Sequence, residues 1–484
     1  MKERPADRAS GPSRAQRPWL GPRPRRGTRT VVMSGLAIAA ALALAAVSGQ
    51  ASGRAAAVRP VTVTGLATAR FPTLAGVAPL GVNTASWDGY YTDPDIPGLL
   101  SRARLQTLRW PGGSWGDVYN WQTNTAEGAA QPVDFAQFES VAAVAGARSF
   151  ITVNYGTGTP ALAGAWVRRA SSTPGQHVAL WEIGNEQYGP WEADDHSHPH
   201  TPESYARGAV PYITAMRRAD PSAVIGMDYA LTARQAAGTG TGVTDPVKWN
   251  DTILSQDGRL FNFADVHWYP FYGTPTLTPR QIMASVLRIP AVMRSIRGTL
   301  GRYDPRAGVV IGETNISNAE ITYNVQPIAA LFAAGTALEW LSQGASSVDW
   351  WDLHNDGTPQ GDYGMLSSGT SGEPAVDTPF PAYYGYLLAS LLASPGARLT
   401  ALPTSSAQVL AFGSRDGRSS AIMLINGGTG PVTVSPQGLA TAAGTVRSYR
   451  YSAADPRITA ASQPAAAVRG GITLPPESIQ VYLG

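Results

Sequence analysis

The chain has 484 residues, of which 43% are hydrophobic and only 15% are charged. This apolar content is ample for a large folded core, which excludes a mainly disordered protein, and the length suits one large domain plus a small one. The sequence contains no cysteine, so disulfides, thiolate metal sites and a cysteine nucleophile are excluded together.

Positive charge is concentrated at the N-terminus. The first 30 residues carry nine basic and two acidic side chains, and because the whole chain has a net charge of +3, the remainder is about −4. An apolar run, Val31 to Val47, and small residues up to Ala57 follow. We interpret residues 1–57 as an export signal, hence a secreted protein, or as an N-terminal membrane anchor if the segment is retained. Beyond this segment the sequence favours neither nucleic acid nor a membrane as a partner.

Eight short apolar segments with β-branched and aromatic residues recur along the middle of the chain. The spans between them are long enough for a helix, and 202–220 shows apolar residues at helical spacing. This alternation predicts an α/β fold, a (β/α)₈ TIM barrel over residues 76–393. The eight predicted strands are Pro79–Asn83, Leu105–Trp110, Ser149–Tyr155, Val178–Glu186, Ala223–Tyr229, Ala264–Tyr269, Val309–Asn315 and Ser347–Leu353.

Residues 394–484 have a different texture, with short strands punctuated by Gly and Ser and no helical periodicity. They predict a C-terminal antiparallel β-sandwich. Within it, we expect Ala454–Arg469 to be a long surface loop. An N-terminal segment, 58–75, contains a short strand at Val61–Val63 that we expect to join the sandwich. The predicted sandwich strands are Val409–Phe412, Ala421–Ile425, Val432–Val434, Val446–Tyr451, Ile472–Leu474 and Ile479–Tyr482.

Two glutamates lie at carboxyl ends of predicted barrel strands, where barrel enzymes place their chemistry. The fourth segment ends in Trp181-Glu182-Ile183-Gly184-Asn185-Glu186, and the seventh contains Gly312-Glu313-Thr314. Retaining hydrolysis of a glycosidic bond needs one carboxylic acid and one carboxylate with carboxyl groups about 5 Å apart. Two glutamates across a barrel mouth can meet that spacing.

From about Gly81 to Tyr386 the sequence resembles clan A of the glycoside hydrolases, most closely its arabinofuranosidase, xylosidase and glucuronidase-like branches. The resemblance implies a retaining enzyme with Glu186 as acid/base, Glu313 as nucleophile and Asn185 on the sugar 2-hydroxyl. The bias to arginine over lysine and the abundant Ala and Gly suggest a G+C-rich soil bacterium, so we expect a plant-type polysaccharide or oligosaccharide as substrate, with no cofactor and no metal. The motifs that carry the resemblance are Leu108-Arg109-Trp110-Pro111-Gly112-Gly113, Trp181 to Glu186, Asp220-Pro221-Ser222, His267-Trp268-Tyr269 and Gly312-Glu313-Thr314.

A nucleophilic carboxylate must stay ionised, which a nearby cation and hydrogen-bond donors favour. We expect Arg109 and Tyr269 to do this for Glu313. Strand parity puts Glu182 on the same face as Glu186 if the strand runs regularly, and a buried Glu182 would need a partner such as Arg109. His267 is expected either to contact substrate or orient a catalytic glutamate, or to be a hydrogen-bonded residue of the barrel interior.

Several aromatic residues lie at or beyond the predicted strand ends, where indole faces can stack on sugar rings as well as fill the core. Trp350 and Trp351 are the preferred candidates, because clan A enzymes resembling this chain often place an aromatic there. Asn154, at the end of the third segment, completes the expected substrate-binding set. Further tryptophans at strand ends are Trp87, Trp115 and Trp191.

Alternative functions remain open. Gly112–Gly116 matches the G-x-S-x-G elbow of serine hydrolases, but a helix should follow it and the next residues are poor helix formers. Three histidines in His196–His200, beside Asp194 and Asp195, could bind a divalent metal. Within the glycosidases, a β-xylosidase, a β-glucuronidase or an endoglucanase is the alternative to an arabinofuranosidase. A non-catalytic carbohydrate-binding barrel is disfavoured by the presence of both glutamates.

Overall fold

The structure is a computed structural model, and it describes residues 61–63, 74, 76–176, 178–236, 245–358, 360–416, 419–436 and 444–484. The segment 1–57, predicted as an export signal or anchor, lies outside these residues. Among the residues described, no helix combines the length and the apolar character needed to cross a bilayer.

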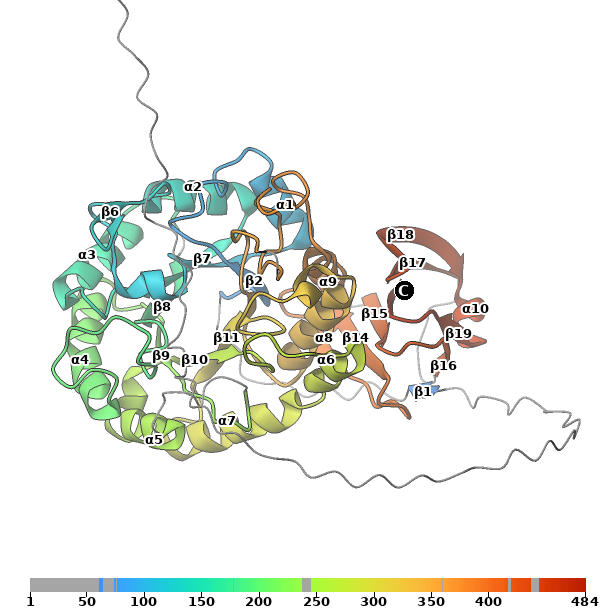
Figure 1. Ribbon diagram of the computed structural model, residues 1–484. Helices are drawn as coiled ribbons and strands as arrows, with labels where there is room; N and C mark the ends of the chain where they lie inside the picture. Colours follow the sequence, from blue (N-terminus) through green and yellow to red (C-terminus); the bar gives the residue numbers. More distant parts are fainter. Residues whose placement is uncertain are drawn as a thin grey trace, which may run out of the picture. The chain divides into compact units, whose positions relative to one another are not determined.

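Eight parallel strands close into a barrel with helices around it (Figure 1), so the predicted (β/α)₈ fold is confirmed. Each strand overlaps its predicted segment, and the last pairs with the first to close the barrel. In order around the barrel the strands are β2 (Leu80–Asn83), β3 (Thr107–Trp110), β7 (Arg148–Val153), β8 (Val178–Ile183), β9 (Ile225–Asp228), β10 (Phe263–Trp268), β11 (Gly308–Thr314) and β12 (Val348–Trp350).

The helices alternate with the strands along the sequence, and most of them begin at a proline or at a capping residue. Pro occupies the first turn of most of them, and a Thr or Asp side chain caps several, as Thr201 does by accepting a hydrogen bond from the Ser204 N–H at 3.3 Å. The helices are α1 (Ile96–Ala103), α2 (Phe135–Ala145), α3 (Pro160–Ser171), α4 (Pro202–Ala219), α5 (Pro246–Asp257), α6 (Pro279–Val286), α7 (Ile289–Tyr303), α8 (Ile328–Ser342) and α9 (Pro381–Ala389).

The loop after β3 is elaborated above the barrel mouth. It contains the 3₁₀ helix η1 (Gly113–Asp117) and a small antiparallel sheet of β4 (Tyr119–Asn120), β5 (Thr125–Ala126) and β6 (Ala129–Ala130). This loop therefore carries the G-x-S-x-G segment into a 3₁₀ turn rather than into an α-helix.

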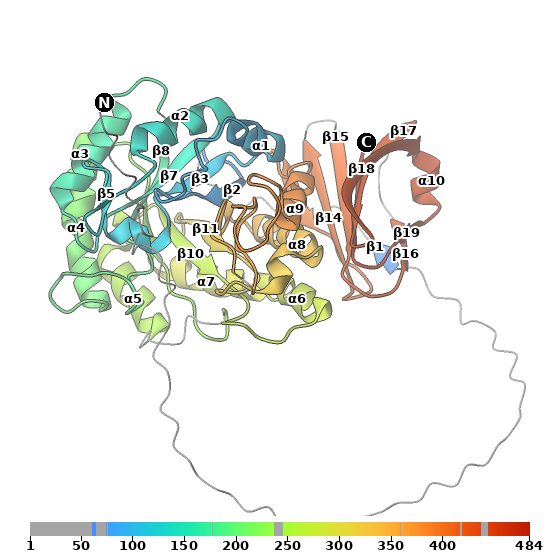
Figure 2. The ribbon, with the colours of Figure 1, turned by 45° about the horizontal axis from the view of Figure 1, so that its top comes forward.

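The C-terminal region forms a six-stranded and a three-stranded sheet with a separate apolar core between them. In the second sheet, β1 (Val61–Val63) pairs in parallel with β16 (Val432–Pro436), and β16 pairs with β19 (Ile472–Leu474); Figure 2 shows the three side by side. The strands are β13 (Arg398–Ala401), β14 (Val409–Asp416), β15 (Ser419–Asn426), β16 (Val432–Pro436), β17 (Thr445–Ser452), β18 (Asp455–Pro464), β19 (Ile472–Leu474) and β20 (Ser478–Leu483).

The prediction of a long surface loop at Ala454–Arg469 is wrong. Most of it is β18, which pairs antiparallel with β17 at the edge of the larger sheet, followed by the short helix α10 (Ala465–Arg469). Most side chains of β18 are exposed, so the segment lacks the apolar alternation that marks a half-buried strand. Proline near both ends is compatible with an edge position.

Helix α8 explains how the sandwich is attached to the barrel. All but one of its residues are buried, because one side covers the barrel and another side meets the C-terminal sheet. A side chain at Gly335 would place its Cβ 3.0 Å from Leu410 of β14, so the two elements are in close contact there. Tyr384 of α9 also stacks on Tyr451 of β17, with ring centroids 6.2 Å apart.

Candidate active site

Two glutamates approach each other at the carboxyl ends of β8 and β11. Glu313 lies within β11, and Glu186 lies three residues beyond β8 in a left-handed conformation with φ +44°. One oxygen of each carboxyl group and one nitrogen of His267 lie within 4.8 Å of one another. The barrel thus brings together two residues that are 127 positions apart in the sequence.

Glu313 is held by donors on both of its oxygens. Arg109 Nη1, from β3, donates to Oε1 at 2.7 Å, and the hydroxyl of Tyr269, next to the end of β10, donates to Oε2 at 2.8 Å. Burial raises the pKa of Glu313, and the nearby Glu186 charge adds to this rise, whereas His267, Arg109 and Tyr269 oppose it. These three groups stabilise the ionised form against the effect of burial.

Arg109 connects the nucleophile candidate to the rest of the barrel interior. The guanidinium is buried, with 1% of its side chain exposed. Its Nη2 donates to Glu182 Oε2 at 2.9 Å and to Asn185 Oδ1 at 2.8 Å, while Nη1 also reaches Asn83 Oδ1 at 2.9 Å. The structure therefore gives Glu182 the arginine partner that its buried charge requires.

Glu186 is surrounded by three hydrogen-bonding side chains. The Tyr188 hydroxyl donates to Oε1 and the Trp191 indole N–H to Oε2, both at 2.9 Å, and His267 Nδ1 lies 2.9 Å from Oε1. Burial alone would raise the pKa of Glu186. The His267 hydrogen bond and charge, helped by Trp191 and Tyr188, lower it below its ordinary value.

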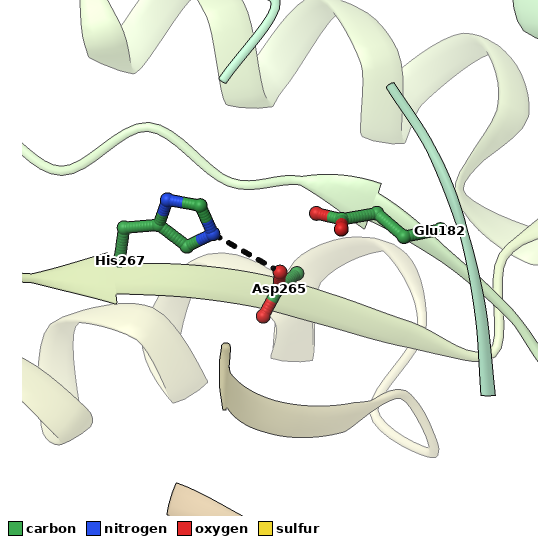
Figure 3. A group of neighbouring side chains, drawn as sticks. All are labelled: Glu182, Asp265 and His267. Carbon is green, nitrogen blue, oxygen red and sulfur yellow. Dashed lines mark hydrogen bonds and ion pairs between the residues drawn. The ribbon is translucent and has the colours of Figure 1, made fainter. Parts of the chain in front are cut away.

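His267 is buried between acidic groups. Its Nε2 lies 3.3 Å from Asp265 Oδ2, a contact that Figure 3 draws. Its Nδ1, which contacts Glu186, also lies 3.5 Å from Glu313 Oε2. Burial disfavours the charged imidazolium, but Glu313, Asp265 and Glu186 together raise the pKa of His267 well above its usual value. Both shifts favour a proton on His267 over a proton on Glu186.

Two groups of residues bring metal-ligating atoms together in the described part of the chain. One is Glu182, Asp265 and His267, shown in Figure 3, and the other is Glu186, His267 and Glu313. The first group is already neutralised by Arg109, whose Nη2 binds Glu182 and whose Nε lies 3.8 Å from Asp265 Oδ2. A cation there would have to compete with a buried guanidinium.

The three histidines of His196–His200 do not form a group of metal-ligating atoms within the described residues. His196 Nδ1 lies 2.8 Å from Asp194 Oδ1, and its ring stacks on Tyr155 with centroids 4.3 Å apart. The His200 N–H donates to Asp194 Oδ2 at 3.1 Å. Asp194 therefore organises this loop locally.

The predicted substrate-binding residues do not all face the glutamates. Trp350 is fully buried, packs edge-on against Phe332 and Tyr386 of the surrounding helices, and cannot stack on a sugar, so that expectation is wrong. Trp351 is the first residue after β12, which ends at Trp350. A Cβ built on Gly113 would lie 2.6 Å from the Trp351 ring and 3.5 Å from Glu313 Oε1, which places this indole beside the nucleophile candidate.

Asn154 has a local role in the structure. Its Nδ2 donates to the Tyr119 carbonyl and to Thr157 Oγ1, both at 3.1 Å, and its Oδ1 accepts from the Thr157 N–H at 2.9 Å. The amide thus ties the end of β7 to the loop after β3, and none of these bonds reaches Glu186 or Glu313.

Three residues of the site, Glu192, Tyr188 and Asp265, were not predicted from the sequence. Trp191, expected as a stacking surface, uses its indole N–H on Glu186 instead. Ser114 of the G-x-S-x-G segment donates to Glu192 Oε1 at 2.9 Å, which gives it a structural partner in place of a catalytic histidine. Tyr188 and Trp191 follow Glu186 at two and five residues, and this aromatic spacing was the available signal.

Comparison with known proteins supports the clan A resemblance, although no family model matches. Among curated proteins, a probable α-L-arabinofuranosidase C of Aspergillus niger is 25% identical over 160 residues, covering 27% of this chain and 31% of that protein. An intracellular exo-α-(1→5)-L-arabinofuranosidase of Bifidobacterium longum is 27% identical over 218 residues, covering 39% of this chain and 36% of that protein. The chain therefore spans about a third of the length of these relatives.

Solved structures share the fold over nearly the whole chain. A family 51 α-L-arabinofuranosidase of Bifidobacterium longum has a TM-score of 0.68 at 17% identity, covering 89% of this chain and 100% of that one. The Thermotoga maritima α-L-arabinofuranosidase has a TM-score of 0.64 at 18% identity, covering 88% and 99%. A Fusarium oxysporum 4-O-α-L-rhamnosyl-β-D-glucuronidase reaches 0.62 at 16% identity, covering 87% and 99%. The fold is thus that of the clan A barrel enzymes, shared by proteins of different specificity.

Proposed function

We propose that this protein is a retaining glycoside hydrolase, arabinofuranosidase-like, with Glu313 as nucleophile and Glu186 as acid/base. The observation that carries the proposal is the approach of the two carboxyl groups, whose nearest oxygens lie within 4.8 Å. An inverting enzyme needs its carboxyl groups about 6.5–9.5 Å apart to admit a water molecule between the sugar and the base. This shorter spacing favours direct attack by one carboxylate.

In the first step, a carboxylate oxygen of Glu313 attacks the anomeric carbon while the bond from that carbon to the leaving oxygen breaks. Glu186 gives its proton to the leaving oxygen, so a covalent glycosyl-enzyme ester and a free alcohol result. In the second step, Glu186 takes a proton from water, whose oxygen attacks the anomeric carbon and releases Glu313. Arg109 and Tyr269 support this role because both donate to the carboxylate that must be ionised.

The acid step needs a proton on Glu186, and His267 is positioned to supply it. Its Nδ1 lies 2.9 Å from Glu186 Oε1, so one proton can move between the two atoms without any rearrangement of the chain. A leaving oxygen at Glu186 favours the neutral acid there. His267 thus acts as the store of the catalytic proton in the unliganded protein.

Charge in the site favours a neutral sugar over a uronic acid. In the described part of the chain, the cationic groups in contact with either glutamate are Arg109 and His267, and both are already paired with carboxylates. A sugar carboxylate would meet this acidic surrounding without a free cationic partner, which is costly in a buried site. This disfavours the β-glucuronidase alternative and leaves arabinofuranosides, xylosides and glucans.

The similarity to curated arabinofuranosidases favours an α-L-arabinofuranoside among these neutral sugars. The Trp351 indole lies beside Glu313, and we assign the 2-hydroxyl to Asn185, whose amide oxygen accepts a hydrogen bond from Arg109. The β-xylosidase and endoglucanase alternatives share these features, so the choice of sugar rests on the relatives.

The test is a panel of 4-nitrophenyl glycosides: α-L-arabinofuranoside, β-D-xyloside, β-D-glucoside and β-D-glucuronide. We expect the arabinofuranoside to be hydrolysed fastest and the glucuronide not measurably. Fastest hydrolysis of the glucuronide would contradict the charge argument. Failure to cleave any glycoside, together with sugar binding, would favour the carbohydrate-binding barrel.

We also propose that the protein is exported, because a basic segment, an apolar run and small residues follow one another in residues 1–57. Sequencing the N-terminus of protein recovered from the culture medium tests this. A start within residues 50–60 is the expected result, and recovery only in the cell membrane fraction would favour the retained anchor.

A further inference from the structure

Glu192 is a further buried acid of the site, and it binds Asn185 rather than Glu186 or Glu313. It lies in the loop after β8, with 5% of its surface exposed. Its Oε1 accepts hydrogen bonds from Asn185 Nδ2 at 2.8 Å and from Ser114 Oγ at 2.9 Å. Its Oε2 is buried and has no hydrogen-bond partner among the described residues.

The orientation of the Asn185 amide follows from its two neighbours. Arg109 can only donate hydrogen bonds, so the atom facing it must be the amide oxygen, which lies 2.8 Å from Nη2. Oε1 of Glu192 accepts, so the atom facing it must be the amide nitrogen. A flipped amide would set NH₂ against the guanidinium and oxygen against the carboxyl group. Asn185 is therefore locked, with one N–H used on Glu192 and the second available.

The turn that carries Glu192 also holds the acid/base. Trp191, the residue before it, donates its indole N–H to Glu186, the residue after Asn185. Two consecutive residues of the loop thus bind two consecutive residues at the end of β8. The turn is tight at Gly189, where a Cβ would lie 2.2 Å from the Trp191 ring, so its path leaves no room for a side chain there.

We propose that Glu192 is a positioning residue, which fixes the amide of Asn185 so that its free N–H meets the 2-hydroxyl of the sugar in the transition state. This inference rests on the proposed function. Hydrogen bonds to the 2-hydroxyl that strengthen in the transition state contribute substantially to glycoside hydrolysis. An amide free to rotate would lose part of that contribution.

A neutral Glu192 suits this role. Burial, followed by the charges of Asp117 and Glu186, raises the pKa of Glu192 well above its usual range, which favours the protonated acid. A neutral acid accepts the Asn185 bond without adding another negative charge beside Glu186. A glutamine, which offers the same carbonyl oxygen, should therefore replace it well.

The experiment compares kcat/KM for 4-nitrophenyl α-L-arabinofuranoside and its 2-deoxy analogue, or for the corresponding pair of the best substrate in the glycoside panel. The ratio of the two values measures recognition of the 2-hydroxyl. It is determined in the wild type and in Asn185→Ala, Glu192→Gln, Glu192→Leu and Ser114→Ala. Ser114→Ala is the matched control, because it removes the other donor to Oε1 and leaves the Asn185 bond.

We expect the wild-type ratio to be on the order of 100 or more, and to fall roughly tenfold in Glu192→Leu. Glu192→Gln and Ser114→Ala should keep the ratio within about threefold of the wild type. A merely structural role would lower activity on both substrates equally, so an unchanged ratio in a folded Glu192→Leu, or a Glu192→Gln ratio as low as that of Glu192→Leu, would overturn the proposal.

Failure of the proposed function gives a different result. If Asn185→Ala keeps the full ratio, Asn185 does not bind the 2-hydroxyl, and the clan A assignment on which this inference rests is wrong at that residue. If the kcat/KM ratio falls in Asn185→Ala but not in Glu192→Leu, the assignment of Asn185 stands and only the proposed role of Glu192 is wrong. If Glu192→Leu does not fold, Glu192→Ala replaces it and is judged by the same ratio.

Discussion

The phenol of Tyr269 donates a 2.8 Å hydrogen bond to Oε2 of Glu313, while the other oxygen of this carboxylate is bound by a buried arginine. The hydrogen bond from Tyr269 lowers the pKa of Glu313 against the effect of burial. In the proposed mechanism the acidic limb of the kcat/KM profile reports ionisation of Glu313. We expect Tyr269→Phe to move this limb to higher pH, because a hydrogen bond that favours the ionised carboxylate is lost.

Tyr188→Phe is the matched control, since it removes a phenol from Glu186 instead of Glu313. That hydrogen bond lowers the pKa of Glu186 and does not touch Glu313, so its loss should leave the acidic limb in place. If Tyr269→Phe left the acidic limb unchanged, or if both variants moved the same limb, the separate roles of the two glutamates would be wrong.

A second prediction concerns metals. In the proposed mechanism both glutamates must be free to react, and Arg109 supplies the positive charge next to Glu313. Dialysis against EDTA should therefore leave kcat/KM unchanged. Loss of activity that added zinc restores would contradict the mechanism and would direct attention back to His196–His200 or to the glutamates themselves.

Stability should depend on pH through Glu339 in the last turn of α8. Burial raises its pKa to about 7 from a usual value of 4.5, although Gln343 donates a 3.0 Å hydrogen bond to it. Because the folded pKa is the higher one, the native state is favoured below about pH 4.5, and this contribution is lost as the pH rises through about 7. The full difference is on the order of 3 kcal/mol.

Urea unfolding of wild type and Glu339→Gln at several pH values measures this effect. The variant cannot ionise, so its free energy of unfolding should exceed that of the wild type at pH 8.5 and approach it at pH 5. Equal differences at both pH values would show that Glu339 does not titrate on folding.

The apolar surface of α8 predicts that the sandwich is needed for solubility. Helix α8 is buried by the barrel and by Leu410 and its neighbours in β14 and β15, which share one continuous core. A chain ending at Ser394 should expose this surface and be recovered as insoluble protein. A soluble and fully active barrel of that length would show that the two parts are independent.

Much of the barrel could be predicted because each strand is a short apolar run between helix-length segments. The edge strand β18 could not, because its exposed side chains carry no such signal. Trp350 is the last residue of β12 and Trp351 lies just beyond it, so separating the two depends on a strand bound, which sequence defines only to a few residues. The positions of the eight strands were therefore more predictable than the directions in which their side chains point.

Within the site, Glu186, Glu313, Arg109 and Tyr269 occur at strand ends, so topology alone brings them together. Glu192 lies in an irregular loop, where no periodicity relates it to Asn185. Its contact depends on the tight turn at Gly189, and only the structure shows it.

The most direct test of the central claim is azide rescue of Glu186→Ala on an aryl glycoside with a good leaving group. Such a leaving group needs no proton, so the glycosyl-enzyme ester on Glu313 still forms, but its hydrolysis should slow by roughly 100-fold or more without a general base. Azide needs no base, and it should restore turnover and yield a glycosyl azide with the anomeric configuration of the substrate. A glycosyl azide of inverted configuration, or no rescue at all, would contradict the assignment of Glu186 and Glu313.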